Sequence, residues 1–227
     1  MEENAQQIAH QAIMAFFQRD KQDKQVRYHH LNKLVKKGQI LFCGSSLMEQ
    51  FPIYELMLNR DLPYTIYNRG IGGFTTSEML EALEPCVLEL EPEYIFINIG
   101  TNDLNGPDAS VPALIKNYEE ILNRIRARLP EAKFFLLAYY PVNDEVGLRN
   151  PMGEVFKYRT NALLNEANEA VRQLAERFGA TFLDVNDGIK DENGRMKEEY
   201  TIEGMHMYGD GYDRVLEALL PVLENLD

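Results

Sequence analysis

Short apolar runs alternate with longer segments of helical periodicity from Gly38 to the end of the chain. Continuously apolar runs are typical of buried parallel strands, whereas apolar residues three and four positions apart are typical of helices. We expect strands at residues 39–43, 64–67, 93–99, 133–138 and 180–185, and helices at residues 76–83, 112–129, 156–178 and 211–226. Right-handed crossovers place such helices on both faces of the sheet. The pattern therefore predicts an α/β fold: a three-layer α/β/α sandwich, flavodoxin-like, with about five parallel strands.

A further helical pattern covers residues 2–37 and ends at Gly38. Its apolar residues form an early stripe and a later one: Ile8, Ala12, Ile13, Phe16 and Phe17, then Val26, Leu31, Leu34 and Val35. We expect residues 1–37 to be an N-terminal helical extension packed on a single domain of residues 38–227. Contact between two copies of the chain is the alternative, and the sequence leaves a homo-oligomer open.

Composition and charge narrow the class of protein. The 227 residues are 45% hydrophobic and 26% charged, as in a soluble globular protein, and no apolar run approaches the roughly 20 residues of a membrane helix. The first residues are acidic and polar, unlike a secretory signal, so a cytoplasmic location is expected. A formal net charge of -13 disfavours nucleic acid as a partner because it repels phosphate backbones.

The sequence gives no sign of a disulfide or of a metal site. Cys43 and Cys86 lack paired spacing, and no residues are spaced like metal ligands. We therefore expect no disulfide, metal or cofactor.

The first predicted strand ends on a glycine that two serines follow. Open parallel sheets bind ligands at the carboxyl ends of their strands, so the Ser46 hydroxyl is expected in a reactive place. A serine becomes a nucleophile when an imidazole takes its proton and a carboxylate orients that imidazole. His206 and Glu203 could supply these groups from one short turn, because they are three residues apart. Asp184 and Asp187, near the end of the fifth strand, are alternative acids.

Acyl transfer also needs donors aimed at the oxygen that becomes negative in the tetrahedral intermediate. The Gly73 N–H and the Asn102 side-chain amide are candidates because they follow neighbouring strands at one sheet edge, and the Ser46 N–H is a third. Each has a purely structural alternative. Gly73 can permit a turn, Asn102 can cap a helix or bind its own backbone, and the serines can cap the next helix.

Four blocks follow one another along the chain: residues 44–47 (Gly-Ser-Ser-Leu), 68–73, 100–103 (Gly-Thr-Asn-Asp) and 203–206 (Glu-Gly-Met-His). In this order they resemble the motifs of the SGNH or GDSL-type serine hydrolases, a superfamily of esterases, lipases and acylhydrolases that includes lysophospholipase-like and platelet-activating-factor-acetylhydrolase-like members. The resemblance implies that Ser46 is the nucleophile and that Gly73 and Asn102 donate to the oxyanion. It also implies that His206 shuttles the proton while Glu203 orients it.

Two residues depart from the family pattern. Ser45 stands where the family has Asp, which implies changed local hydrogen bonding with activity retained. Glu203 also stands where the family has Asp, and its extra methylene changes how the carboxylate reaches the imidazole. Either the local backbone compensates, or Glu203 swings away and a backbone carbonyl orients His206.

The function expected from these residues is cofactor-independent hydrolysis of a small-molecule carboxylic ester through an acyl-enzyme. A loop expected at residues 139–153 is only modestly apolar, which favours a short acyl chain; the residues expected to line the pocket are Val142, Val146, Leu148, Met152 and Leu104. Two alternatives remain. An alcohol could intercept the same acyl-enzyme, as in an acyltransferase, or the chain could be a noncatalytic flavodoxin-like module that holds an anion on helix N-termini.

Overall fold

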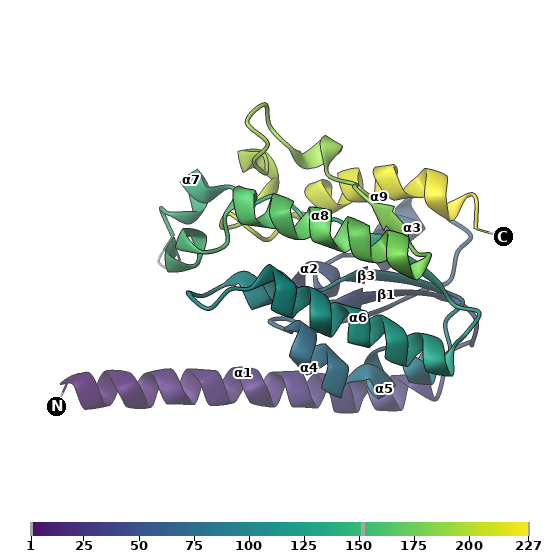
Figure 1. Cartoon of the computed structure of the whole chain (residues 1–227), viewed down its shortest axis with the longest axis horizontal. Helices are drawn as coiled ribbons and strands as arrows, with labels where there is room; N and C mark the ends of the chain where they lie inside the picture. The colour runs from purple at the N-terminus through teal and green to yellow at the C-terminus, as the bar shows by residue number, and fades with distance from the viewer. Residues whose placement is uncertain (1, 151–152, 227) are drawn as a thin grey trace.

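One five-stranded sheet organises the chain in the computed structural model, which describes residues 2–150 and 153–226 (Figure 1). All strands are parallel and lie in the order β2-β1-β3-β4-β5. Their bounds are β1 (Ile40–Gly44), β2 (Ile66–Gly70), β3 (Tyr94–Asn98), β4 (Lys133–Leu137) and β5 (Thr181–Leu183). This order, with helices on both faces, confirms the predicted three-layer flavodoxin-like architecture.

Successive side chains of a strand point to opposite faces, so each strand contributes to two cores. On β1, Leu41 and Cys43 join one buried cluster, whereas Ile40 and Phe42 join the other. The first face is covered by α4 (Thr76–Glu81), α5 (Leu83–Cys86), α6 (Val111–Arg128) and α8 (Asn161–Phe178). The second face is covered by α2 (Ser46–Glu49), α3 (Ile53–Asn59) and α9 (Gly209–Leu223) (Figure 1).

Several element bounds differ from those expected. Strand β2 begins and ends later than residues 64–67, because Asn68, Arg69 and Gly70 pair in register with the end of β1. Helix α8 begins at Asn161, where the Thr160 hydroxyl accepts a hydrogen bond from a backbone N–H of the first turn. The segment expected as an irregular loop contains α7 (Asp144–Gly147). Short 3-10 turns complete the chain: η1 (Leu88–Leu90), η2 (Thr101–Leu104), η3 (Gly153–Lys157), η4 (Asp187–Ile189) and η5 (Glu198–Tyr200).

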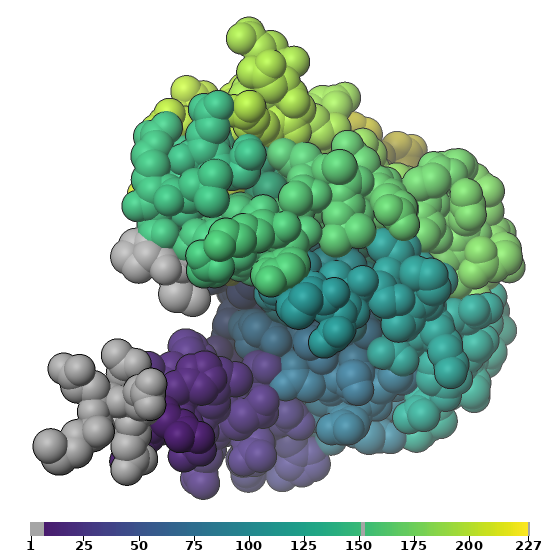
Figure 2. All heavy atoms as spheres, turned by 60° about the vertical axis from the view of Figure 1, so that its left-hand side comes forward, coloured from purple at the N-terminus to yellow at the C-terminus, as the bar shows by residue number. Residues whose placement is uncertain are grey.

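Helix α1 (Glu2–Asn32) lies along the α5 side of the domain and ends before the expected residue 37 (Figure 1). Its C-terminal half contacts the domain through hydrogen bonds, including those from Tyr28 and Asn32. Residues 7–17 are exposed, and Phe16 is 68% exposed, so the early apolar stripe is not covered by the domain (Figure 2). The division into an extension of residues 1–37 and a domain of residues 38–227 stays a prediction.

Two further features bear on the class of protein. No helix in the described part of the chain is long and apolar enough to cross a membrane. Cys43 and Cys86 are both buried free thiols, and Cys43 lies inside β1, where it packs as a small apolar residue.

Candidate active site

The end of β1 places Ser46 at the switch point of the sheet. Strand β1 pairs with β2 on one side and with β3 on the other, and such a point is where open α/β sheets bind ligands. Gly44 has φ +146°, and a Cβ there would lie 2.0 Å from the Asn98 carbonyl oxygen. Only glycine therefore allows the chain to turn this close to β3. Ser46 follows as the first residue of α2 and is partly exposed.

His206 lies between Ser46 and Glu203. Its Nε2 is 2.8 Å from Ser46 Oγ, and its Nδ1 is 2.5 Å from Glu203 Oε1. The backbone N–H of His206 donates to the same carboxylate oxygen at 3.2 Å. With the proton on Nδ1 facing the carboxylate, Nε2 accepts the hydrogen bond from the serine hydroxyl. The longer Glu203 side chain thus reaches the imidazole and does not swing away from it.

The turn that carries Glu203 and His206 is fixed by its own backbone. Residues 201 and 207 form an antiparallel bridge. The Thr201 hydroxyl donates to the His206 carbonyl at 3.1 Å and accepts from the Gly204 N–H at 2.8 Å. The Gly204 carbonyl in turn accepts from the Asn143 N–H at 2.7 Å. These contacts let a three-residue separation bring both side chains to one place.

The charge of Glu203 suits an orienting carboxylate. Burial raises its pKa, but the hydrogen bond and charge of His206 outweigh burial and leave the pKa below its ordinary value of 4.5. The alternative acids lie elsewhere: Asp184 is 3.6 Å from Lys190, and the Asp187 side chain is fully exposed. Of the three acids considered, only Glu203 has a hydrogen bond to the imidazole.

The predicted oxyanion donors come from the loops after β2 and β3. Gly73 has φ +73°, and its N–H, like that of Ser46, has no hydrogen-bond acceptor within the described part of the chain. Asn102 Nδ2 donates to the Phe74 carbonyl at 2.9 Å, which leaves its second N–H for a ligand. Asn102 Oδ1 accepts from Asn105 Nδ2 at 3.2 Å, which fixes the direction of the amide.

Residues 43–214 match the model of the GDSL-like Lipase/Acylhydrolase family. The chain belongs to this family. It is 27% identical to rat platelet-activating factor acetylhydrolase IB subunit alpha2 over 84% of this chain and 78% of that protein. A solved Streptococcus pneumonia structure, provisionally described as a platelet activating factor, has a TM-score of 0.85 at 31% identity and covers 95% of this chain and 98% of its own. A GDSL-like lipase from Bacteroides thetaiotaomicron is similar in fold, with a TM-score of 0.70 at 20% identity over 88% of this chain and 97% of its own.

Ser45 is one of the two residues at which this GDSL-like protein departs from the family pattern. The Ser45 hydroxyl, where the family has a carboxylate, is buried and has no hydrogen-bond partner within the described residues. Its backbone N–H donates to the Asn98 carbonyl at 3.2 Å. Ser45 therefore joins β1 to β3 through its backbone, and its side chain contributes no polar contact there.

Arg159 is a residue of this site that the sequence analysis missed. Its guanidinium donates to Asn102 Oδ1 at 2.9 Å and to Asn105 Oδ1 at 2.8 Å, and it contacts Met205 Sδ at 3.3 Å. The side chain is only 3% exposed, and burial lowers its pKa to about 10 although the charge of Glu203 opposes this shift. Arg159 is therefore a buried cation at neutral pH whose hydrogen-bond partners are neutral. Arg159 immediately precedes Thr160, the N-cap of α8, and its hydrogen-bond partners are distant in the chain, so no local sequence motif identifies it.

The residues expected to line an acyl pocket do not share one environment. Leu104 and Val142 are buried in the core below α6 and α8, so they cannot line an open pocket as predicted. Leu148 is instead 61% exposed. Val146 is partly buried, and Met152 lies outside the described residues. The predicted pocket lining is therefore wrong for Leu104 and Val142, because the turns after β3 and β4 fold them inward.

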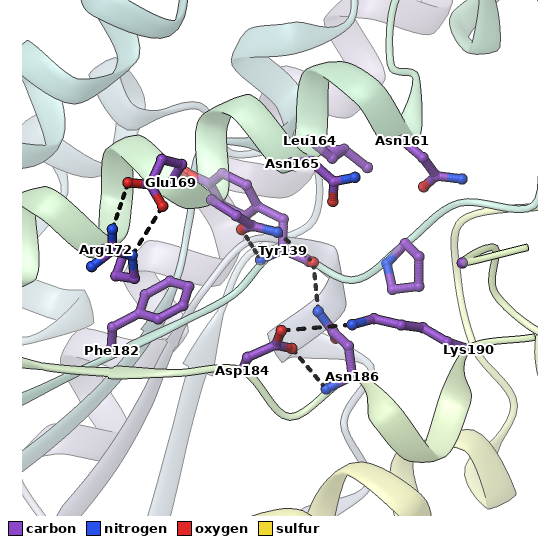
Figure 3. A pocket seen from close by; sticks show the side chains of 13 residues that line it. Tyr139, Asn161, Leu164, Asn165, Glu169, Arg172, Phe182, Asp184, Asn186 and Lys190 are labelled. Atoms are coloured by element: carbon purple, nitrogen blue, oxygen red, sulfur yellow. Dashed lines mark hydrogen bonds and ion pairs between the residues drawn. The ribbon is translucent and has the colours of Figure 1, made fainter.

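A separate polar cavity of about 250 Å³ lies between α8 and the turns that follow β4 and β5 (Figure 3). Asn168 and Asn186 on its wall bind the backbone of Tyr139, and Asn161 binds the backbone of Val142. These amides fix the segment after β4. Asp184, the rejected alternative acid, lines this cavity, whereas Ser46, Glu203 and His206 do not. Across the described ranges, no three His, Cys, Asp or Glu side chains are grouped as a metal site requires.

Proposed function

We propose that this family member hydrolyses a carboxylic ester through an acyl-enzyme on Ser46. The continuous contact from Glu203 through His206 to the Ser46 hydroxyl, at 2.5 and 2.8 Å, carries the proposal. Membership in the GDSL-like lipase/acylhydrolase family supports ester hydrolysis as the reaction class. The placement of two candidate oxyanion donors on the loops beside Ser46 supports an acyl carbonyl as the reacting group.

The reaction begins when Ser46 Oγ attacks the acyl carbon and His206 Nε2 takes the serine proton. The carbonyl π electrons move to oxygen, which becomes the oxyanion held by the Gly73 and Ser46 N–H groups and the free N–H of Asn102. Collapse of the intermediate breaks the bond to the leaving alcohol, which takes the proton from His206. Water then hydrolyses the acyl-enzyme by the same steps. It loses a proton to His206 and attacks the acyl carbon, and the second intermediate collapses to release the acid while Ser46 regains its proton from His206.

Glu203 supports this proton transfer in two ways. Its contact with Nδ1 holds the tautomer in which Nε2 can act as a base. Its negative charge stabilises the imidazolium that forms when Nε2 takes the proton, and its lowered pKa keeps it ionised throughout. A carboxylate that already accepts two hydrogen bonds from His206 needs no rearrangement during the step.

For the substrate we propose an ester with a short acyl group. The support is the similarity to curated relatives named as acetylhydrolases, which share 27% identity over most of this chain. A short acyl group needs only a small space beside Ser46. Cleavage of long-chain esters with poor cleavage of acetyl and butyryl esters would contradict this substrate.

Hydrolysis of p-nitrophenyl acetate and butyrate without added metal tests the proposal. Ser46→Ala is expected to abolish turnover because it removes the nucleophile. Ser45→Ala is the matched control: it deletes the neighbouring hydroxyl, which is buried without a hydrogen-bond partner among the described residues, and activity is expected to persist. Equal rates for wild type and Ser46→Ala would refute the proposal. Chromatography of products formed with an added alcohol separates hydrolysis from acyl transfer.

A further inference from the structure

Helix α1 contacts the loop that carries Gly73. Lys21 Nζ donates to the Gly73 carbonyl at 2.9 Å and forms an ion pair with Glu78 Oε1 at 2.6 Å. Glu78 also accepts from the Thr75 N–H at 3.0 Å, so it caps α4 at the end of the same loop. The Lys21 side chain is only 13% exposed. The ammonium is therefore held between the loop and the start of α4 and is largely shielded from solvent.

Two neighbouring turns of α1 reach the same loop. Tyr28 donates its hydroxyl hydrogen to the Gly70 carbonyl at 2.6 Å. Lys24 lies 2.7 Å from Glu49, and the other Glu49 oxygen accepts from the Gly72 N–H at 2.8 Å. Residues 21, 24 and 28 are spaced three and four apart, so they share one face of the helix. This polar face therefore contacts Gly70 at the end of β2 and Gly73 in the loop directly, and Gly72 through Glu49.

We propose that α1 positions the oxyanion donor and that Lys21 is its principal positioning residue. The inference rests on the proposed function, in which the Gly73 N–H binds the oxyanion. Gly73 is exposed, has φ +73° and follows another glycine, so its own backbone resists rotation weakly. A donor has to lie within about 0.5 Å of its productive place to act. The contact with Lys21 supplies the restraint that the glycine backbone lacks.

The packing around Gly73 agrees with this role. A Cβ at position 73 would lie 3.3 Å from Lys21 Cε, so the aliphatic stem of the lysine also packs on the loop. Glu78 neutralises the ammonium, which makes Lys21 a local restraint and not a free charge for the substrate. The space-filling view shows a hollow between α1 (purple) and the segment around α7 and η3 (teal to green), so α1 forms one side of this depression (Figure 2).

A positioning role for Lys21 predicts a specific kinetic effect. A misplaced oxyanion donor weakens binding of the transition state while leaving binding of the substrate ground state almost unchanged. Removal of one donor lowers kcat by about 100- to 1,000-fold in enzymes of this chemistry, so partial misplacement is expected to lower it by about 10- to 100-fold. A residue that served only folding would change the amount of folded enzyme and not its kcat.

The test is Lys21→Met, which keeps an unbranched stem but removes the donor. Lys21→Arg is the conservative variant. Arg19→Met is the matched control, because Arg19 is 74% exposed on the same helix and, among the described residues, forms an ion pair with Asp23 alone. The kcat and KM of each variant are measured with p-nitrophenyl acetate. Active sites are counted by titration with a fluorophosphonate, so that kcat refers to folded enzyme. Inhibition is measured with an alkylboronic acid that forms a tetrahedral adduct with the nucleophile.

For Lys21→Met we expect kcat to fall about 10- to 100-fold, KM to stay within about twofold, and the boronate inhibition constant to rise by a factor similar to the loss of kcat. Lys21→Arg is expected to recover part of kcat, and Arg19→Met to match the wild type. Unchanged kcat and boronate affinity in Lys21→Met would overturn the inference. If that variant does not fold, Tyr28→Phe removes only the donor to Gly70, and an unchanged kcat there would overturn it as well.

These outcomes separate the two proposals. Inactive wild type, or activity that survives in Ser46→Ala, removes the proposed function and this inference with it. Activity that depends on Ser46 but not on Lys21 removes the positioning role alone.

Discussion

His206 Nε2 lies 2.8 Å from Ser46 Oγ although the two residues are 160 positions apart in the chain. Ser46 is placed by the end of β1, a buried central strand, whereas His206 comes from an irregular turn between η5 and α9. The turn is held through Thr201 and Asn143, so the contact depends on the loop after β4 as well as on the sheet. Variants of the turn therefore test how the site is assembled.

We expect unequal losses when the imidazole and its carboxylate partner are removed. His206→Ala removes the base and should lower kcat by about 10⁵- to 10⁶-fold, whereas Glu203→Ala leaves a base with a poorly fixed tautomer and should lower it by about 10³- to 10⁴-fold. Steady-state kinetics with p-nitrophenyl acetate measure both. Glu198→Ala, an exposed carboxylate near the same turn, is the control. Equal losses of kcat for the two variants, or no loss for His206→Ala, would contradict the assignment of His206 as the base and Glu203 as its orienting carboxylate.

The charge of Glu203 should make part of the stability depend on pH. Although burial raises its pKa, the contact with His206 leaves it below 4.5, so folding favours the carboxylate. Stability from a lowered pKa is present above the unfolded value and is lost as pH falls through the folded value. We expect the unfolding free energy of wild type to exceed that of Glu203→Gln most near pH 6, and the difference to shrink below about pH 4.5. Urea titrations from pH 6 to pH 3 measure it; a constant difference would contradict the prediction.

The strands and the place of Ser46 at the end of β1 could be predicted from the sequence because their information is local. Apolar runs located all five strands, although not all of their bounds, and the polar residues after β1 and β3 marked the sheet edge where the candidate site lies. The end of β2 could not be found this way. Asn68 and Arg69 look like loop residues, yet Asn68 Nδ2 donates to the Met48 carbonyl and Arg69 Nε to Asn32 Oδ1, so distant partners satisfy them inside the sheet.

The contacts of helix α1 and of Arg159 could not be predicted for the same reason, because they depend on partners distant in the chain. The apolar stripe suggested that Phe16 and its neighbours face the domain, but the domain is contacted through the polar face that carries Lys21 and Lys24. The hydrophobic pattern cannot identify such a face, because its partners are Glu49 and Glu78 from other elements. The neutral partners of Arg159 are likewise distant in the chain, and no spacing rule connects them.

Removal of the buried Arg159 guanidinium should impair Asn102, the second proposed oxyanion donor. Arg159→Met deletes the shorter of two hydrogen bonds to Asn102 Oδ1. The amide then keeps the longer bond from Asn105 and its own bond to the Phe74 carbonyl, so it is held less firmly, and we expect kcat to fall about 10- to 100-fold. Arg159→Lys keeps a charge without the planar set of donors and should recover little. The control is Arg149→Met, which removes an exposed arginine paired with Glu198. The measurement is steady-state kinetics, made on variants whose melting temperatures match that of the wild type. An unaltered kcat in Arg159→Met would show that Asn102 does not depend on the hydrogen bond from Arg159.

The close approach of β1 to β3 predicts an unequal cost of adding a methyl group to two glycines. Gly44 (φ +146°) and Gly38 (φ +71°) both have positive φ, so alanine is strained at either position, by about 1 kcal/mol at Gly38, which lies in the left-handed region. At Gly38 the added Cβ meets no atom within 4 Å, whereas at Gly44 it would lie 2.0 Å from the Asn98 carbonyl oxygen and force the strands apart. We therefore expect Gly38→Ala to lose about 1 kcal/mol in urea unfolding and Gly44→Ala to lose more than about 3 kcal/mol or fail to fold. Equal losses at the two positions would show that β1 can move away from β3 at little cost, and that the placement of Ser46 does not depend on this contact.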